Sequence, residues 1–261
     1  MRNFLRILVL IAVSGVFIPQ VRAQESVSAN NENAVEPAGS TLNLGAGFVY
    51  RSPVYRGQDA DGLPIPMIFY QKGNLYFRGS RLGYQFYKND AFSLDVLAAW
   101  AFRGYDDDDS RHLNGMDDRD PSIEGGLAAS YHDGWGTASV SFLTDLLGKH
   151  DGQELTFSYA KRFIREPWEL TPSAGITWQS ANLTDYYYGV EQKEVAAGRP
   201  RYSAGEAWNP FVALTTQYYF TEKWSSLVML QYEWLNNEIS DSPIVNKQYQ
   251  VRVMAGIMCK F

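Results

Sequence analysis

The feature that most constrains this chain is the alternation of apolar with polar or small side chains along many segments of about ten residues. In the clearest segment, residues 91–103, Phe92 and Val96 share one face and Asp95 lies on the other. A repeat of two residues is the period of a β-strand, because successive side chains point to opposite faces. No segment carries a sustained i, i+3, i+4, i+7 apolar stripe, so the sequence predicts an all-β protein.

The strands can be counted from the same pattern. Nine segments are regular: residues 41–50, 91–103, 121–131, 136–146, 153–164, 168–179, 210–220, 224–235 and 247–261. Residues 64–87 are less regular, because the apolar parity switches across Gly79-Ser80, as it would at a turn or a β-bulge. A barrel with both termini on one side needs an even number of strands. Three short strands (64–70, 74–79 and 80–87) give twelve, which we predict; a single strand over 80–87 gives ten, the alternative.

The positions of the tryptophans favour a membrane barrel over a soluble sandwich. Charged residues on one face of each strand fit either fold, since a sandwich could turn them toward water. The seven tryptophans all fall at or near predicted strand ends: Trp100, Trp135, Trp168, Trp178, Trp208, Trp224 and Trp234. Barrel tryptophans gather in girdles at the two membrane interfaces. The sequence therefore predicts an antiparallel outer-membrane β-barrel over residues 41–261, with these seven residues as its interfacial girdle.

The predicted connections alternate between tight turns and long polar loops. The long ones span residues 51–63, 104–120, 180–208 and 236–246. Short periplasmic turns with longer outer loops are typical of outer-membrane barrels. A mean hydropathy of −0.29 excludes a bundle of transmembrane helices, because each helix needs about 20 apolar residues.

The last segment alternates up to the final residue, which resembles the signal read by the barrel assembly machinery. Its predicted signal residues are Tyr249, Val251, Val253, Ile257 and Phe261. Cys259 falls on the same apolar face, where a lipid-facing thiol is expected. As the only cysteine, it excludes an internal disulfide framework and a Cys-based zinc site.

Residues 1–23 have the composition of a secretory signal peptide. A charged start precedes an apolar run over residues 7–18, and Val21-Arg22-Ala23 suits a cleavage site. We therefore expect export and cleavage, followed by a polar periplasmic segment over residues 24–40. Removing residues 1–23 leaves 20 Lys and Arg against 29 Asp and Glu, a net charge of −9 that argues against nucleic acid as a partner.

Few residues could carry enzymatic chemistry. An Asp/His pair at the outer rim could activate water, with His112 near Asp106–Asp109 or His150 beside Asp151. His132 falls in a predicted turn, where a solvated side chain is expected. No Gly-x-Ser-x-Gly elbow or Ser/His/Asp spacing accompanies the histidines. We therefore predict no enzyme, no catalytic residue and no cofactor.

The densest charge cluster lies in the predicted outer loop 104–120. Its carboxylates could hold a divalent cation that bridges to lipopolysaccharide phosphates, or attract cationic solutes. The Asp-x-Asp-x-Asp-Gly spacing of a calcium loop is missing, and a solvated acidic loop is the alternative. The candidate metal ligands are Asp106, Asp107, Asp108, Asp109, Asp117 and Asp118.

Charges of both signs fall on the predicted inward face of the strands. They are Asp95, Arg103, Glu124, Asp145, Arg162, Glu233 and Arg252. In a barrel of ten or twelve strands such side chains can pair and largely fill the lumen, so we expect a closed or very narrow barrel. Tyr186-Tyr187-Tyr188 could stack on a sugar or on an aromatic residue of a partner, or continue the girdle into a loop.

Several short segments recur in an order that resembles a known family. The first are Asn43-Leu44-Gly45-Ala46-Gly47-Phe48-Val49-Tyr50, Pro53-Val54-Tyr55-Arg56-Gly57, Leu63-Pro64-Ile65-Pro66 and Leu82-Gly83-Tyr84. The later ones are Leu113-Asn114-Gly115-Met116, Tyr187-Tyr188-Gly189-Val190 and Asp241-Ser242-Pro243-Ile244-Val245. Together they resemble the MltA-interacting protein (MipA)/OmpV family. The ending Met258-Cys259-Lys260-Phe261 departs from that family's usual Tyr-Arg-Phe but keeps the aromatic terminus.

The resemblance implies a non-enzymatic barrel in the outer membrane of a Gram-negative cell, in contact with outer-membrane lipid and lipopolysaccharide. For the founding branch it implies a scaffold that links a lytic transglycosylase to a peptidoglycan-synthesising penicillin-binding protein. Relatives are also described as porin-like or adhesive. We therefore expect a scaffold for peptidoglycan-remodelling enzymes, with a narrow porin-like channel or an adhesin as alternatives.

Overall fold

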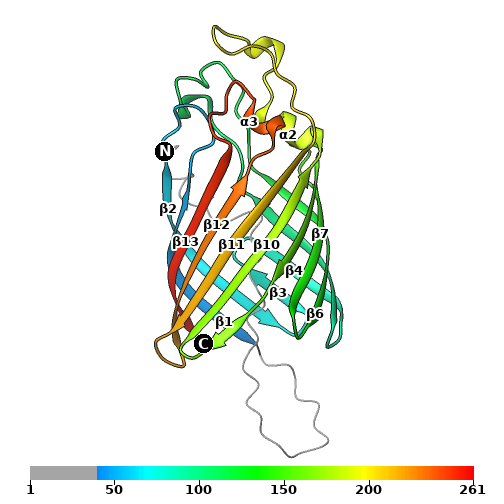
Figure 1. Ribbon diagram of the computed structural model, residues 1–261, viewed down its shortest axis with the longest axis vertical. Coiled ribbons are helices and arrows are strands. Elements are labelled where there is room, and N and C mark those ends of the chain that lie inside the picture. The colour runs from blue at the N-terminus through cyan, green and yellow to red at the C-terminus, as the bar shows by residue number, and fades with distance from the viewer. Residues whose placement is uncertain (1–39) are drawn as a thin grey trace, which may run out of the picture.

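Strands make up most of residues 40–261, the part of the chain that this computed structural model describes (Figure 1). The predicted signal peptide, residues 1–23, and the predicted polar segment up to residue 39 lie outside the described residues. The strands are β1 (Thr41–Arg51), β2 (Asp61–Lys72), β3 (Leu75–Arg78), β4 (Arg81–Lys88), β5 (Phe92–Ala101), β6 (Ser122–Asp133), β7 (Gly136–Asp145), β8 (Gln153–Ala160), β9 (Phe163–Arg165), β10 (Trp168–Gln179), β11 (Ala207–Tyr219), β12 (Trp224–Trp234) and β13 (Tyr249–Lys260).

The strands close into an antiparallel barrel. Neighbours in sequence pair with one another, and β1 pairs with β13 from Asn43 opposite Lys260 to Arg51 opposite Arg252. β8 and β9 both pair with β10 in one continuous register, so they form a single strand of the wall. The wall therefore has twelve strands, which confirms the predicted all-β barrel of twelve.

The break between β8 and β9 falls opposite a proline. β8 ends at Ala160, which pairs with Ser173, and β9 begins at Phe163, so Pro172 lies across from the break. Proline has no N–H to give to a neighbouring strand. The Lys161 N–H still donates to the Pro172 carbonyl (3.1 Å), and this keeps the two parts in register. The sequence predicted one uninterrupted strand here, because the alternation of side chains does not depend on whether a facing residue has a backbone N–H.

The parity switch between residues 64 and 87 is a turn. β3 and β4 form a short hairpin in which Arg78 pairs with Arg81 around Gly79-Ser80. Gly79 has φ +61°, a left-handed conformation that glycine adopts without a steric penalty. β3 is only four residues long, so this hairpin does not reach the outer end of the barrel wall.

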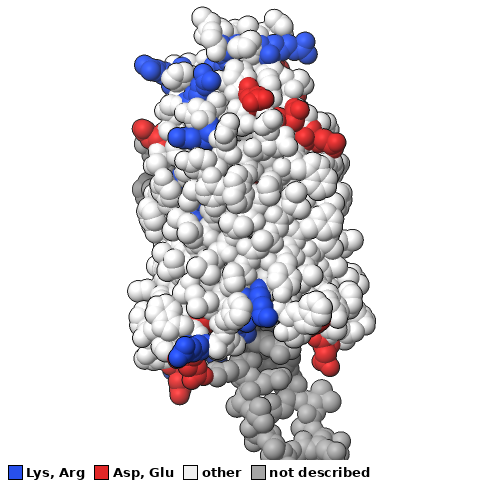
Figure 2. Space-filling view, in the orientation of Figure 1, with Lys and Arg blue, Asp and Glu red and all other residues white. Residues whose placement is uncertain are grey.

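The outer face of the wall is apolar. Phe48, Leu127, Phe142 and Leu230 are large exposed side chains on four different strands. Figure 2 shows that charged side chains on the viewed face gather mostly at the two ends of the barrel and leave an uncharged band between them. Such a belt marks a wall that spans hydrocarbon.

The connections differ in length at the two ends of the barrel. Tight turns such as Gly73-Asn74 and Gly134-Trp135 lie at the end where the chain stops, which is the periplasmic end in outer-membrane barrels. The long connections at the other, outer end carry α2 (Ala181–Tyr188), α3 (Asn237–Ser240) and the single turns η1 (Asp107–Asp109) and η2 (Gln192–Glu194) (Figure 1). Within residues 40–261, no helix is long and apolar enough to cross a membrane.

The interior of the barrel has an apolar side and a polar side. The apolar side belongs to β2, β12 and β13 and consists of Ile65, Met67, Phe69, Leu227, Met229, Met254 and Met258. Glycines make room for it: a Cβ added at Gly256 would lie 2.2 Å from the Met67 sulfur. The polar side carries hydroxyl pairs such as Thr156 with Thr177 on β8 and β10, 3.2 Å apart. The interior is therefore amphiphilic.

Candidate functional site

The long outer connections pack into one lid over the barrel, which we define as residues 52–60, 102–121, 180–206 and 235–248. The core of the lid joins residues from all four segments: Val54, Tyr55, Tyr105, Leu113, Met116, Val190, Ile244 and Val245. Leu113 and Ile244 are completely buried. Burial of apolar surface contributes about 25 cal/mol per Å², so this core holds the loops on one another.

Tyrosines connect the lid segments. The Tyr55 ring lies edge-on to Tyr105 and stacks on Tyr188, with centroids 4.7 and 5.8 Å apart. The Tyr55 hydroxyl donates to the Tyr187 carbonyl (3.2 Å), and the Tyr187 hydroxyl donates to the Asp120 carbonyl (3.1 Å). Burial raises the pKa of all four phenols, because it disfavours the charged phenolate. These side chains therefore act as neutral donors and ring contacts.

A buried ion pair links two lid segments. The Nη2 of Arg119 lies 2.8 Å from Oε1 of Glu194, and the two side chains are 5% and 1% exposed. Arg119 Nε donates to the Tyr186 carbonyl (2.6 Å), while Glu194 accepts the Asp117 N–H (2.9 Å). Such bonds compensate for the hydration that a buried pair loses. The guanidinium of Arg199 donates to three further lid carbonyls.

At the base of the lid, charged side chains meet inside the outer mouth of the barrel. Arg103 bonds to Glu154 and lies 3.6 Å from Glu124. Arg252 pairs with Glu233 at 2.7 Å. A solute that entered from the outside would therefore meet first the lid and then a layer of paired charges.

His150 is buried in this charged layer with a geometry that does not suit catalysis. Its Nδ1 accepts the Gly152 N–H (3.0 Å), which assigns the ring proton to Nε2, 3.7 Å from the Glu124 carboxylate. Ser122 donates its hydroxyl to Asp145 and not to the histidine. A nucleophilic serine must donate its hydroxyl hydrogen to a general base. These residues therefore form a structural network.

The residues of the other predicted histidine arrangements make structural contacts. The Asp151 N–H donates to Asp145 (3.0 Å), as does the His150 N–H (2.7 Å), so the predicted His150 and Asp151 share an acceptor. His112 is exposed on the lid, and its carbonyl accepts a bond from Arg199 (2.7 Å). His132 lies near the end of β6, with Nδ1 3.0 Å from the Thr137 hydroxyl.

The acidic loop is brought together in part. Three carboxylates can each offer an oxygen within 4.8 Å of one another: Asp106, Asp108 and Asp109. Asp117 instead bonds to Lys193 at 2.5 Å, and this contact lowers the pKa of its carboxyl. Asp118 accepts the Asp107 N–H (2.9 Å). Three of the six predicted ligands could thus share a cation, while Asp117 and Asp118 bond to other lid residues.

The predicted girdle tryptophans lie in two groups. Trp135, Trp168 and Trp224 are at the periplasmic end, and Trp100, Trp178, Trp208 and Trp234 are at the outer end. Trp178 and Trp208 face each other across β10 and β11, with ring centroids 6.4 Å apart. Aromatic rings at two levels of a barrel wall fit two membrane interfaces.

The remaining predicted residues lie on or beside the strands of the wall. Asp95 is buried on β5. Arg162 donates from Nε and Nη2 to both carboxylate oxygens of Glu169, each at 2.5 Å, which is a bidentate pair. The predicted assembly-signal residues lie on β13, with Phe261 directly after it.

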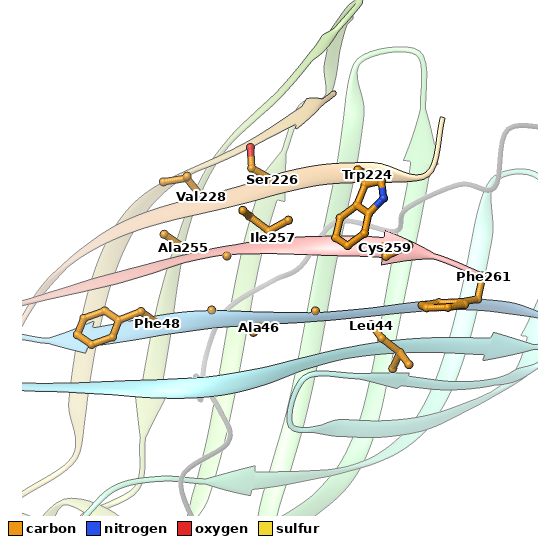
Figure 3. A pocket seen from close by; sticks show the side chains of 13 residues that line it. Leu44, Ala46, Phe48, Trp224, Ser226, Val228, Ala255, Ile257, Cys259 and Phe261 are labelled. Atoms are coloured by element: carbon orange, nitrogen blue, oxygen red, sulfur yellow. The ribbon is translucent and has the colours of Figure 1, made fainter. Parts of the chain in front are cut away.

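Cys259 lines an apolar groove of about 840 Å³ on the outer wall, where β1, β12 and β13 meet (Figure 3). Leu44, Phe48, Trp224 and Phe261 line the same groove, with their side chains on its surface. The thiol therefore lies on the apolar outer face that the sequence predicted.

The residues that hold the lid together could not be found from sequence patterns. Arg119, Glu194 and Arg199 lie in segments without periodicity, and each has bonds to residues that are distant in sequence. One signal was present. The loop segments that resemble the MipA/OmpV family, such as Leu113–Met116 and Asp241–Val245, supply much of the lid core.

The fold and the lid define the class of this protein: a twelve-stranded outer-membrane β-barrel whose outer mouth is covered by packed loops. Residues 44–261 match the family model described as MltA-interacting protein MipA, and the chain belongs to this family. It is 30% identical over 231 residues to the MltA-interacting protein of Escherichia coli (strain K12), a match that covers 87% of this chain and 93% of that protein.

Two further comparisons extend the likeness. The chain is 31% identical over 184 residues to the outer membrane protein OmpV of Vibrio cholerae serotype O1, covering 70% of this chain and 72% of that protein. Among solved structures, an outer membrane channel from Pseudomonas putida F1 aligns with 87% of this chain and 97% of that chain, at 12% identity and a TM-score of 0.40.

Proposed function

We propose that this protein is a non-enzymatic scaffold that is closed at its outer end and recruits peptidoglycan-remodelling enzymes at its periplasmic end. The lid carries the proposal, because its loops pack a core of their own above a layer of paired charges. A barrier to solutes needs such packing, whereas an open pore does not. The name of the Escherichia coli relative, MltA-interacting protein, supports a peptidoglycan enzyme as partner. We expect a lytic transglycosylase and a penicillin-binding protein.

The periplasmic end offers exposed aromatic surface for a partner. Trp135 is 76% exposed at the β6–β7 turn, and Phe163 and Ile164 of β9 are also exposed at this end. Aromatic side chains are enriched in protein interfaces. Insertion into the lipid interface is the other use of such residues, so the test needs a matched tryptophan at the outer end.

Capture of the enzymes tests the scaffold. We expect the purified full chain to retain a membrane-bound lytic transglycosylase, and Trp135→Ser to reduce the amount captured several-fold. Trp208→Ser, the same change at the outer end, should leave capture unchanged. Equal capture by both variants would show that the β6–β7 turn does not contact the enzyme. If the unchanged protein captured no enzyme, the scaffold proposal would be contradicted.

A narrow channel is the second candidate, favoured by the polar side of the interior, where hydroxyl pairs such as Ser130 with Ser139 line the wall. Planar-bilayer recording separates the two functions. We expect no discrete conductance from the unchanged protein. Discrete steps that change when Glu124→Gln or Arg162→Gln is introduced would establish the channel instead.

A further inference from the structure

The outer half of β2 has a partner on one side only. β1 pairs with β2 along Asp61–Gln71, whereas β3 pairs with β2 only along Phe69–Lys72. The β3–β4 hairpin ends at this height, and its Gly79 N–H donates to the Ile68 carbonyl (3.1 Å). Within residues 40–261, no backbone hydrogen bond reaches this edge of β2 on the outer side of Ile68.

Two prolines blunt the free edge. The Ile68 carbonyl faces β3, and backbone groups along a strand alternate in direction, so Pro66 and Pro64 face the same side. Proline has no N–H, and prolines in sheets belong to edge strands for this reason. The segment Leu63-Pro64-Ile65-Pro66 thus removes two donors that would otherwise be unpaired.

The free edge lies within the apolar belt. Pro64 is opposite Phe48 in the β1–β2 register, and Phe48 is 49% exposed on the outer wall, where it lines the groove of Figure 3. An unpaired N–H is costly in hydrocarbon, because no water is present to accept it. The prolines are therefore placed where the wall borders lipid of the outer leaflet.

Behind the free edge the interior is apolar. Ile65 and Met67 alternate with the prolines, are buried, and pack with Met229 and Met254 in the apolar side of the interior. Methionine side chains adapt to irregular apolar partners. An apolar interior behind an unpaired stretch of lipid-facing wall suits a hydrocarbon chain better than a hydrated solute.

Phe102 is held beside this opening. Its carbonyl accepts a hydrogen bond from Nη1 of Arg51 (2.5 Å), which lies on β1 next to the start of β2. The Phe102 ring stacks on Trp100 with centroids 5.3 Å apart, yet it is 8% exposed whereas Trp100 is 39% exposed. The Trp100 N–H bonds to the Ser80 carbonyl at the hairpin tip (3.1 Å). Phe102 thus lies on the outer side of the hairpin tip, and its side chain is buried.

We propose that the wall between β2 and β5, above the β3–β4 hairpin, is a lateral portal through which the acyl chain of an outer-leaflet lipid reaches Ile65 and Met67, with Phe102 as its plug. An acyl chain fits because the surroundings of the edge and the interior behind it are both apolar. A chain that enters from the bilayer also needs no passage through water. The portal does not depend on the scaffold, which concerns the periplasmic end.

Photo-cross-linking in vesicles of phosphatidylethanolamine and phosphatidylglycerol tests the portal. Benzoylphenylalanine is placed at position 65 in the full chain, and phospholipid adducts are measured by mass spectrometry after irradiation. Position 48, on the lipid-facing wall, is the positive control. Position 141, which shares the inward face of β7 with buried Leu143, is the negative control. We expect adducts at 65 and 48 but not at 141.

The plug is tested in the same assay. Phe102→Ala should raise the adduct yield at position 65 several-fold, whereas Phe142→Ala, on another part of the wall, should not. Heat-modifiable migration selects folded protein, and position 49 on β1, which packs against the same apolar side, replaces position 65 if that variant does not fold. Adducts at position 48 but at neither 65 nor 49, in both the unchanged protein and Phe102→Ala, would overturn the portal. An adduct yield at position 141 equal to that at 65 would overturn it as well.

Discussion

Arg119 and Glu194 show how much the surroundings of one ion pair decide what it contributes. Both groups are buried and fully engaged in hydrogen bonds within the lid. The neighbouring pair of Lys193 with Asp117 is made of the same kinds of charge but lies in solvent. Removing one partner of a buried pair leaves the other charge without compensation, whereas an exposed charge regains water.

Glu194→Gln should therefore destabilise the lid by about 3–5 kcal/mol, because the Arg119 guanidinium stays buried beside a neutral amide. Limited proteolysis of the folded barrel measures this as faster cleavage within residues 102–121 and 180–206. Lys193→Gln, one residue away, should leave cleavage nearly unchanged. Equal protection of both variants would show that the lid does not need the buried pair.

Gly256 illustrates a second requirement on a single residue, which is space. A Cβ there would lie 2.2 Å from the Met67 sulfur and 2.7 Å from the Ala46 carbonyl oxygen. Gly256→Ala should cost about 1–3 kcal/mol of barrel stability through overpacking, measured by urea unfolding in detergent. Gly134→Ala is the control, because nothing lies within 4 Å of the added Cβ. A similar loss in both variants would point to backbone effects instead.

At the scale of elements, the strands were predictable because each carries its own signal. One strand face meets lipid and the other meets the interior, so residues such as Phe92 and Asp95 must alternate wherever the wall is regular. The parity switch at Gly79-Ser80 could be predicted for the same reason, because a turn interrupts the alternation. β11 begins at Ala207, three residues before its predicted start, because pairing with β10 extends past the end of the alternating pattern.

The lid was not predictable in this way. Its contacts, such as Tyr55 with Tyr105 and Arg119 with Glu194, join segments that are brought together only by the closed barrel. No repeating pattern within either segment predicts these contacts. The pairing of Arg103 with Glu154 and Glu124 likewise depends on which strands become neighbours and on where β5 ends.

The prolines of β2 make a prediction at the same scale. Pro64→Thr with Pro66→Thr restores two N–H donors on the free edge, and unpaired donors in hydrocarbon cost several kcal/mol each. We expect a lower yield of folded barrel in vesicles, read from heat-modifiable migration. Pro53→Thr, the same exchange in the lid segment 52–60, should fold normally. Normal folding of the double variant would mean that the edge is satisfied by other groups.

For the whole molecule, the lid should be more sensitive to alkali than the wall. Burial raises the pKa of Tyr55, Tyr105, Tyr187 and Tyr188. Free phenols ionise at about pH 10, so the stabilisation is complete below that pH and is lost as pH rises through the higher values in the lid.

Proteolysis of the lid between about pH 8 and about pH 12 should therefore accelerate steeply above pH 10, while the barrel keeps its heat-modifiable migration. Tyr55→Phe should weaken the pH dependence, because one buried phenol no longer ionises. A cleavage rate that stays level across this range would contradict the role of the tyrosines.

The distribution of the lid over four loops also orders the events of biogenesis. Its segments come from connections all around the barrel, and the last, residues 235–248, directly precedes β13, the strand that pairs with β1. Contacts of such long sequence separation form late in folding. We therefore expect the outer surface to be completed only after the wall has closed. An antibody that requires the assembled lid should then distinguish completed molecules from stalled ones on intact cells.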